Sequence, residues 1–481
     1  MKTSKSCLIV LLISALALCF PLFSSSQDCL RLSEQSDITS TCSAIAMTME
    51  HDQMGRPFLY VANKEAGLRI YDISDIQSPA LVQGIGTEML EGLEVMNLSQ
   101  DGNFLYLALG NFFSGNQPPG LAIVDVSAPA NARVRDVWAY SNPTQGAGVV
   151  EVAGQYAYLG AMGHGLITLD IANKDDIEFV SLFTPDIAFP SPNPDPPKYN
   201  ARGMAVQDGL VYLCYDAGGI RIIDVSNPNQ PEEIGRYSNP ALDNLPRAYN
   251  NALLCGNLLY VSFDYCGLEI LDVSNPGNIA PVSWWNPWNC QSNPLNWFSS
   301  PGHTNELAYD ESCGLLFLSS GKSDLQVVDV SNPAQPDHCG SFGSLDDGIG
   351  SWGVASYGDK VFLSYVCSFI PFASTRTGVK VLAYDGPCIT GAGHAENIGL
   401  RVFPNPASST LSVNWEEAGF VAGEVTLQVF GAQGQRVARY RVPASDGSCQ
   451  LDVKLWPSGV YWLVIHIGNA LYTQKVTVNL R

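Results

Sequence analysis

A short motif recurs through most of the chain, and this repeat constrains the fold more than any other feature. Its best copies read Gly-Leu-x-Ile-x-Asp-Val-Ser, as at 120–127 and 267–274, and the copies are spaced about 52 residues apart. Six copies keep an aspartate at one place, and Tyr384 takes that place in a seventh, degenerate copy. The six aspartates are Asp72, Asp125, Asp170, Asp224, Asp272 and Asp329. One supersecondary unit is therefore copied along the chain.

The residues around each motif predict four β-strands per repeat. A β-rich run and a Tyr- or Leu-rich strand, as in 204–213, precede the motif, and a shorter strand such as 233–237 follows it. Turn residues separate these runs. Four-stranded sheets repeated radially are the blades of a propeller. The sequence therefore predicts an all-β fold, with a seven-bladed β-propeller of four-stranded blades over residues 27–385.

The Asp-Val-Ser-Asn-Pro box that ends several motifs, as at 224–228 and 329–333, is rich enough in polar groups to suggest an active site. An aspartate at the end of a strand also accepts hydrogen bonds from backbone N–H groups of the following turn. The proline then ends the strand. A group that recurs once per blade is part of every blade, so we interpret the six aspartates as structural.

The seventh repeat lacks its fourth strand, and residues from the other end of the chain can supply it. Its first three strands are expected within 352–384, after which the chain leaves the propeller. Residues 30–32 precede the first strand of blade one, and pairing the two chain ends removes two exposed edges. Cys29 would then lie near Cys388, which predicts a disulfide between them.

The N-terminus predicts export. Lys2 and Lys5 precede an apolar run from Cys7 to Phe23, and serines follow up to Ser26. This order is typical of a secretory signal peptide, here residues 1–26 with cleavage after Ser26. No later stretch is long and apolar enough to span a membrane, so no transmembrane segment is expected in the mature chain.

The repeat ends at residue 385, and the residue pattern of the sequence changes after it. Residues 386–397 form a linker that contains glycine and alanine, and residues 398–481 hold short alternating runs such as 425–430 and 472–478. About seven short strands in this segment predict a small immunoglobulin-like β-sandwich.

The acidic charge of the protein belongs to its larger part. Residues 27–397 hold 16 Lys and Arg against 41 Asp and Glu, whereas residues 398–481 hold 7 against 5. An acidic surface repels nucleic-acid phosphates and anionic membranes, so no nucleic-acid partner is expected. A solvated acidic shell explains this charge, and the binding of cations is the alternative.

Motifs of nucleophilic, phosphate-binding and zinc-dependent catalysis are absent. The sequence has no Gly-x-Ser-x-Gly, His-Glu-x-x-His, P-loop or Rossmann glycine pattern, and no Asp-x-Asp-x-Asp-Gly calcium loop. We therefore expect no catalytic residue, metal or cofactor.

Two functions remain open. The first is a non-catalytic binding or scaffold protein. The alternative is a secreted hydrolase or lyase that degrades polymers with groups from separate blades.

The connection after the fifth motif is the most unusual stretch of the chain. Four of the nine tryptophans lie in it. Trp284 and Trp285 are expected within the fourth strand of blade five, whereas Trp288 and Trp297 are expected in a loop that reaches one face of the propeller. A Cys266–Cys290 disulfide is predicted to hold this loop.

Further polar residues are expected on the same face of the propeller. Aromatic rings with nearby Arg and His suit a glycan, peptide or protein ligand. The predicted ligand-binding residues are Trp288, Trp297, His303, His164, Arg202 and Arg247.

Two resemblances to known families refine these expectations. The repeat resembles the LVIVD-repeat family over roughly residues 43–385, which implies a propeller outside the cytoplasm and no particular reaction. The segments 404–406, 428–435 and 458–461 and the strand around Lys475 resemble a type IX secretion (Por) C-terminal sorting domain. This resemblance implies that residues 398–481 contact the type IX secretion machinery. It also implies a protein that is secreted or attached to the outer surface.

Overall fold

The computed structural model describes residues 29–479 except 112–115, 144, 192–198, 293–299, 369–372, 386–400, 416–423, 432–435, 455 and 468–469. The predicted signal peptide and linker lie outside the described residues, so both stay predictions.

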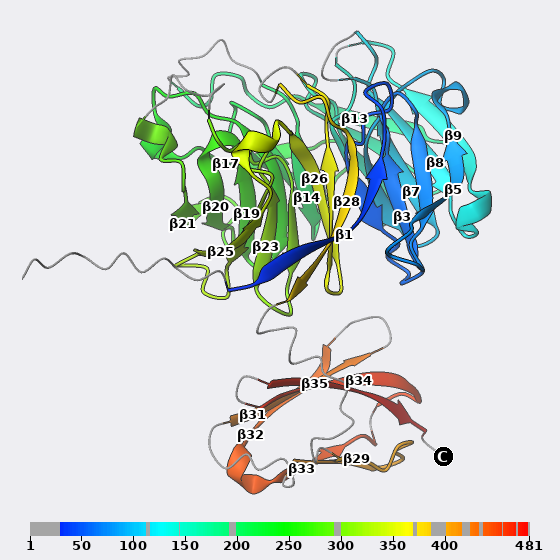
Figure 1. Ribbon diagram of the computed structural model, residues 1–481, viewed down its shortest axis with the longest axis vertical. Coiled ribbons are helices and arrows are strands. Elements are labelled where there is room, and N and C mark those ends of the chain that lie inside the picture. Colours follow the sequence, from blue (N-terminus) through cyan, green and yellow to red (C-terminus); the bar gives the residue numbers. More distant parts are fainter. Residues whose placement is uncertain are drawn as a thin grey trace, which may run out of the picture.

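Residues 31–385 form seven four-stranded antiparallel sheets, called blades one to seven here, with strands a to d from the axis outward (Figure 1). Blades one to three consist of β2 (Met49–His51), β3 (Phe58–Ala62), β4 (Leu68–Asp72) and β5 (Ala80–Ile85); β6 (Val95–Asp101), β7 (Phe104–Leu109), β8 (Gly120–Asp125) and β9 (Arg133–Ala139); and β10 (Val149–Ala153), β11 (Tyr156–Gly160), β12 (Leu166–Asp170) and β13 (Glu178–Phe183).

The remaining blades follow the same order. Blades four to six consist of β14 (Gly203–Gln207), β15 (Leu210–Cys214), β16 (Ile220–Asp224) and β17 (Glu232–Tyr237); β18 (Tyr249–Cys255), β19 (Leu258–Phe263), β20 (Gly267–Asp272) and β21 (Ala280–Trp285); and β22 (Leu307–Asp310), β23 (Leu315–Ser319), β24 (Leu325–Asp329) and β25 (Asp337–Phe342). Blade seven consists of β26 (Ser351–Tyr357), β27 (Lys360–Tyr365), β28 (Gly378–Asp385) and β1 (Arg31–Thr39).

The blades form a closed ring. The innermost strands β2, β6, β10, β14, β18, β22 and β26 contact one another in this order, and β26 also contacts β2. The helices among the described residues are short 3-10 turns: η1 (Thr87–Met89), η2 (Pro129–Asn131), η3 (Pro240–Leu242), η4 (Asp264–Cys266), η5 (Cys290–Ser292), η7 (Leu345–Asp347) and η9 (Ala444–Asp446). The predicted all-β propeller is confirmed.

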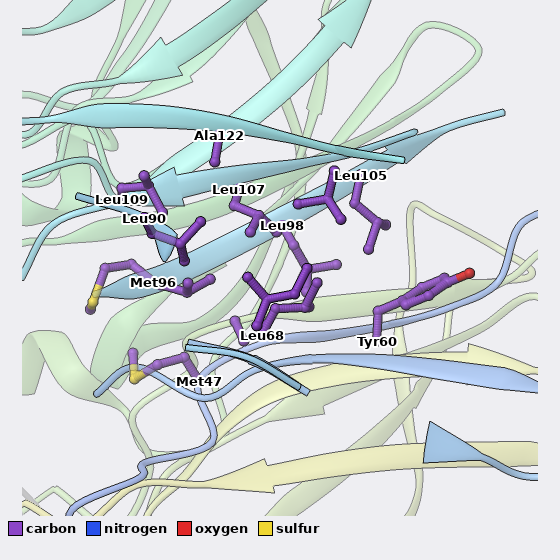
Figure 2. Close-up of a cluster of buried hydrophobic side chains, with 14 of the residues drawn as sticks. Met47, Tyr60, Leu68, Leu90, Met96, Leu98, Leu105, Leu107, Leu109 and Ala122 are labelled. Atoms are coloured by element: carbon purple, nitrogen blue, oxygen red, sulfur yellow. The ribbon is translucent and has the colours of Figure 1, made fainter. Parts of the chain in front are cut away.

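Apolar side chains fill the space between neighbouring blades. Figure 2 shows one such cluster, in which Leu68 of blade one packs with Leu105 and Leu107 of blade two. All three side chains are fully buried. Strands b and c are apolar on both faces because a blade on each side covers them. Burial of each leucine contributes roughly 1.5–3 kcal/mol.

The repeated aspartates shape the turn after strand c. In every copy one carboxylate oxygen accepts a hydrogen bond from the backbone N–H two residues later, at 2.8–2.9 Å. The donors are Ser74, Ser127, Ala172, Ser226, Ser274 and Ser331. Each aspartate makes the turn hydrogen bond that a structural role predicts, and the structural interpretation of the six aspartates stays a prediction.

The same boxes also connect neighbouring blades. The hydroxyl of Ser181 in blade three donates to the Pro228 carbonyl of the next box at 2.6 Å, and Ser283 donates to Pro333 in the same way at 2.6 Å. Gly235 holds the corresponding place in blade four, opposite the Pro276 carbonyl. The box therefore ends one strand and fastens the preceding blade.

The N-terminal strand closes the ring as predicted. β1 pairs antiparallel with β28 from Arg31 opposite Asp385 to Thr39 opposite Gly378, and Figure 1 shows these two strands side by side in blue and yellow. The ring thus depends on residues more than 300 positions apart in sequence. β1 therefore covers the edge of β28 and itself becomes the outermost strand of blade seven.

Disulfides clamp both ends of β1, but one predicted pairing is wrong. Cys29 bonds to Cys339 of β25, rather than to Cys388, and Cys42 bonds to Cys367. The backbone N–H of Cys29 donates to the Cys339 carbonyl at 2.8 Å, so the residues before β1 lie against blade six. Cys388 lies outside the described residues.

The other cysteines of the described residues are either disulfide-bonded, as Cys313 also is, or free. The predicted Cys266–Cys290 disulfide is present, and it joins η4 to η5 on one face of blade five. Cys214, Cys255 and Cys449 carry free thiols.

The C-terminal part has a core of its own. One sheet contains β29 (Arg401–Phe403), β30 (Thr410–Asn414) and β33 (Ser448–Asp452), and the other contains β32 (Arg436–Pro443), β31 (Glu424–Gly431), β34 (Gly459–Ile467) and β35 (Ala470–Val478). Leu411 of the first sheet and Leu427 and Leu463 of the second belong to one buried cluster. Two sheets thus share one core, and the immunoglobulin-like topology stays a prediction.

Candidate functional site at the mouth of the central channel

One cavity lies where the inner strands of all seven blades begin. Its lining residues are Thr48, Met96, Gly148, Arg202, Asn250, Asn305, Glu306 and Trp352. Each lies within the first two residues of a strand a or just before it. The cavity therefore lies on the ring axis, at the face formed by the connections from strand d to strand a. We call this side the entry face.

Two buried side chains present unused hydrogen-bonding atoms at this cavity. The Asn250 amide nitrogen donates to the Thr304 carbonyl at 2.8 Å, but its Oδ1 has no partner within the described part of the chain. The Thr48 Oγ1 has none there either. A buried polar atom without a partner is costly. Both atoms therefore favour a polar group in the cavity.

Arg202, Trp352 and Glu306 bring charge to the same place. The Arg202 guanidinium lies 5.4 Å from the centre of the Trp352 ring, a cation–π distance. Burial raises the pKa of Glu306 to about 7, although a hydrogen bond from the Asn251 amide and the Arg202 charge act against this rise. The mouth thus holds an anchored cation beside a carboxyl group that titrates near neutrality.

Two more glutamates continue the acidic wall along the inner strands. Glu50 lies opposite Tyr60 in blade one, and Glu151 lies opposite Tyr158 at the corresponding place in blade three. Burial raises the pKa of Glu50 to about 7 and that of Glu151 to about 8, and Glu151 also repels both Glu50 and Glu306.

The opposite wall of the channel carries no charge at this level. The corresponding residues of blades four to seven are Ala205, Leu253, Ala308 and Ala355. At this level the channel has an acidic side over blades one and three and an apolar side over blades four to seven, whereas Glu306 lies at the mouth, next to β22 of blade six.

Of the six predicted ligand residues, the structure places Arg202 in the cavity. His303 is 1% exposed, and its Nδ1 lies 2.7 Å from the Asp264 carboxylate. Arg247 is also buried, and one Nη donates to the Ser238 hydroxyl at 2.7 Å. Both side chains therefore hold the connections before strand a.

The other three predicted residues lie elsewhere on the entry face or cannot be placed. His164 is half-buried, with Nε2 3.0 Å from the Asn142 carbonyl oxygen. Trp288 is half-buried as well, and it packs against Trp285 and over the backbone of Gly302. Trp297 lies outside the described residues. Their roles in ligand binding stay predictions.

Trp284 and Trp285 occupy the positions expected of strand d. Trp284 donates from its indole nitrogen to the Cys266 carbonyl at 2.9 Å, and Trp285 stacks on His338 of blade six at 6.4 Å between ring centres.

A second cavity, of about 260 Å³, lies at the opposite face between blades seven and one. His51 and Tyr357 stack in its wall with ring centres 3.4 Å apart, beside Ile73, Ile76 and Phe362. Burial lowers the pKa of His51, so its imidazole is neutral at neutral pH. This cavity marks the seam where the ring closes.

Sequence reasoning missed most of the mouth. Thr48, Asn250, Asn305 and Trp352 carry no motif, and they lie in four separate repeats. The signal that was available is positional. Each lining residue lies at or just before the start of a strand a, and these residues differ in chemistry from one repeat to the next.

The fold and its repeats define the class of the molecule, a β-propeller built from LVIVD repeats. The residues that match the LVIVD repeat family are 57–87, 94–135, 146–183, 200–239, 250–283 and 316–343. Residues 401–479 match the family described as secretion system C-terminal sorting domain. The chain therefore carries six LVIVD repeats and a type IX sorting domain, and the protein is secreted or surface-attached.

No curated protein matches the sequence. Sqt1 of Saccharomyces cerevisiae is a similar solved structure, with 10% identity and a TM-score of 0.48 over 79% of this chain and 96% of that chain. The β-propeller domain of Myceliophteria thermophila Cps50 (Swd1) is similar at 11% identity and a TM-score of 0.48, over 73% of this chain and 99% of that one.

Two further findings concern the described residues alone. No group of three or more His, Cys, Asp or Glu side chains within them is arranged to hold a metal ion. None of their helices has the length and apolar character needed to cross a bilayer.

Proposed function

We propose that this protein is a non-catalytic binding or scaffold protein, delivered by type IX secretion, that captures an extracellular ligand at the entry face of its propeller. The mature parts are the propeller at 27–385, a linker at 386–397 and the sorting domain at 398–481, after removal of the signal peptide at 1–26. The ligand is a glycan, a peptide or a protein.

One observation carries this proposal. Residues of every blade line a single cavity, and the Thr48 hydroxyl and Asn250 amide oxygen in its wall are buried without a partner in the described chain. Convergent polar groups in a concave site are the usual signature of ligand binding. Arg202 adds a charged group with an aromatic neighbour beside the opening.

A binding screen with two matched arginine variants tests the proposal. The wild-type protein is applied to glycan and peptide arrays, and each captured ligand is measured again with Arg202→Ala and Arg236→Ala. Arg236 lies in the same blade but pairs with Asp186 and Glu233, away from the cavity. We expect Arg202→Ala to lose the ligand and Arg236→Ala to keep it. Absence of any captured ligand, or equal loss in both variants, would contradict the proposal.

Deletion of residues 398–481 tests the sorting role and the domain limits. We expect the remaining propeller to unfold at the same temperature but to be missing from the cell surface and the medium. Surface labelling of the truncated protein in its host measures this. Normal delivery without the segment would reject the assigned role.

A second candidate function rests on the channel carboxyl groups. Glu50 and Glu151 have a raised pKa of about 7 and about 8, as a general acid for the cleavage of polymers requires. A secreted hydrolase or lyase would then use these groups. Release of products from polysaccharide or protein substrates by wild type, and its loss in Glu50→Gln or Glu151→Gln, would favour this candidate.

A further inference from the structure

We infer that the mouth of the channel binds a primary ammonium group, as carried by a lysine side chain or an amino sugar. The inference rests on the proposed binding function and names the chemistry of its ligand. Three independent features support it: the unused acceptor atoms, the size of the cavity and the excess of carboxyl groups over cations.

The oxygen atoms without a partner in the cavity wall favour a ligand that donates hydrogen bonds. The Asn250 side chain is 3% exposed and that of Thr48 is 8% exposed, and both have an oxygen without a partner in the described chain. The Asn250 oxygen accepts hydrogen bonds and cannot donate one. A primary ammonium group carries three donors. Asn250, Thr48 and the Glu306 carboxylate offer three acceptors in the wall of one cavity.

The size of the cavity selects a compact group. Its volume of about 10 Å³ is about the space that one water molecule needs. A guanidinium or a sugar ring is larger than this, whereas an ammonium group is close to water in size. Met96 and Trp352 in the same wall provide apolar surface for the carbon chain that carries the ammonium.

Charge favours a cation at this place. Glu151 interacts with both Glu50 and Glu306, and Arg202 is the cation that acts on Glu306. The propeller as a whole is strongly acidic, which draws cationic ligands to it. Arg202 lines the same cavity and lies over Trp352, with its guanidinium 5.4 Å from the ring centre.

The groups that face these carboxyls set a characteristic pH dependence. Arg202 and Cys214 act on Glu306, Asp52 acts on Glu50, and Glu151 faces the other two glutamates. Glu306 must be ionised to attract the ammonium, and its pKa is about 7. Affinity therefore increases as the pH rises through this value. It falls again above about pH 10, where an alkylammonium loses its proton.

The test uses the full chain and a pair of probes that share a five-carbon chain and differ in the head group, which is a charged ammonium in one and a neutral hydroxyl in the other. Pentylamine and 1-pentanol are titrated calorimetrically across this pH range, followed by an acetylated lysine amide and glucosamine to separate the two natural sources. We expect pentylamine to bind with the stated pH profile and 1-pentanol to bind at least about tenfold more weakly, since a hydrogen bond to a charged group is worth that factor or more.

Three variants connect the binding to the cavity. Glu306→Gln and Thr48→Val keep the shape of each side chain, and each is expected to weaken pentylamine binding about tenfold or more. Glu232→Gln removes a carboxylate from the exposed start of β17 and is expected to change nothing. Thermal unfolding of each variant confirms that it is folded.

Each result has a defined meaning. Equal binding of pentylamine and 1-pentanol, or pentylamine binding that survives Glu306→Gln, overturns the inference. Calcium or sodium that binds more tightly than pentylamine and requires Glu306 overturns it in favour of a metal ion. If no amine binds while an array ligand is still lost in Arg202→Ala, the inference fails and the proposed function stands. If neither kind of ligand binds, both fail.

Discussion

The outer turns of the blades and the mouth of the channel differ in how strictly the repeat is kept. At the outer turns, six aspartates make the same hydrogen bond to the turn after strand c, within 2.8–2.9 Å. At the mouth, the residues that begin the inner strands include threonine, methionine, glycine, arginine, asparagine and tryptophan. The copies agree where each blade needs the same bond, and they differ where all blades share one space.

The carboxyl groups of the two regions are also opposite in their response to pH. Hydrogen bonds from the serine two residues later hold the pKa of Asp72, Asp125, Asp224 and Asp272 below the usual range. Burial instead raises the pKa of the three channel glutamates. The outer carboxylates thus stabilise the fold when ionised, whereas the channel glutamates weaken it when ionised. This difference separates the carboxyl groups that shape the blade turns from those that line the channel.

The largest expected effect comes from breaking the ring itself. In the double variant that combines Cys29→Ser and Cys42→Ser, β1 loses the disulfide at each of its ends. Each bond closes a loop of more than 300 residues, so we expect the free energy of unfolding to fall by about 4 kcal/mol or more in total. Chemical denaturation measures this loss.

Hydrogen exchange gives the control for this prediction. Amides of β28 that pair with β1 should exchange faster in the double variant, whereas those of β20 in blade five should keep their protection. If β28 stays protected and stability is unchanged, β1 is held by packing alone and the clamps are dispensable.

A second prediction concerns the folding stability that is lost when the buried channel carboxyl groups ionise. The pKa of Glu50, Glu151 and Glu306 rises from 4.5 to about 7, 8 and 7 on folding. The folded state therefore binds more protons than the unfolded state between these values, and stability falls as the pH rises from about 4.5 to about 8. A triple variant that combines Glu50→Gln, Glu151→Gln and Glu306→Gln should not show this loss of stability.

Urea unfolding at several pH values measures the difference. The triple variant should match the wild type well below pH 4.5, where the glutamates are protonated in both states, and exceed it at about pH 8. Glu232→Gln, at an exposed position, is the control and should follow the wild type throughout. A triple variant that is less stable at every pH would mean that the ionised carboxyls support the fold.

The propeller could be predicted from the repeat, because each copy indicates the same strands and turns. Closure by β1 followed from counting: blade seven lacked a strand, and residues after the leader were left over. The partner of Cys29 did not follow, since it depends on how the chain before β1 crosses to blade six. Such a crossing has no local signature in the sequence.

The candidate site was harder to predict because its members are far apart in sequence. The tryptophan-rich loop attracted attention by composition, yet His303 and Arg247 are buried on structural partners. Arg202 was identified because it follows a strand d and precedes a strand a. The same reasoning, applied to every blade, leads to Thr48, Asn250, Asn305 and Trp352. Position within the repeat was the better guide.

A smaller effect is expected from the contact between neighbouring blades. Gly235 lies so close to the Pro276 carbonyl oxygen that a side chain there would collide with the backbone. Gly235→Ala should therefore cost about 1–3 kcal/mol of stability, as overpacking usually does. Ser283→Ala removes one hydrogen bond at the corresponding place and should cost about 1 kcal/mol. Equal stability of Gly235→Ala and wild type would mean that the two blades can separate at no cost.

The smallest expected effect belongs to a single turn at the outer part of a blade. The Asp224 carboxylate accepts from the Ser226 N–H at 2.9 Å, and its pKa is lowered by this serine. Asp224→Ala should cost about 1 kcal/mol at neutral pH, as the loss of a capping group usually does. Because the folded-state pKa is lowered, this stabilisation is present above the ordinary pKa and is lost as the pH falls through the folded value. The variant and the wild type should thus converge in stability in acid, and Asp243→Ala, at an exposed position, provides the baseline.

Binding of any channel ligand should be unchanged in Asp224→Ala, since Asp224 does not line the cavity. A change in affinity would show that the outer turns and the channel mouth are coupled through the blade.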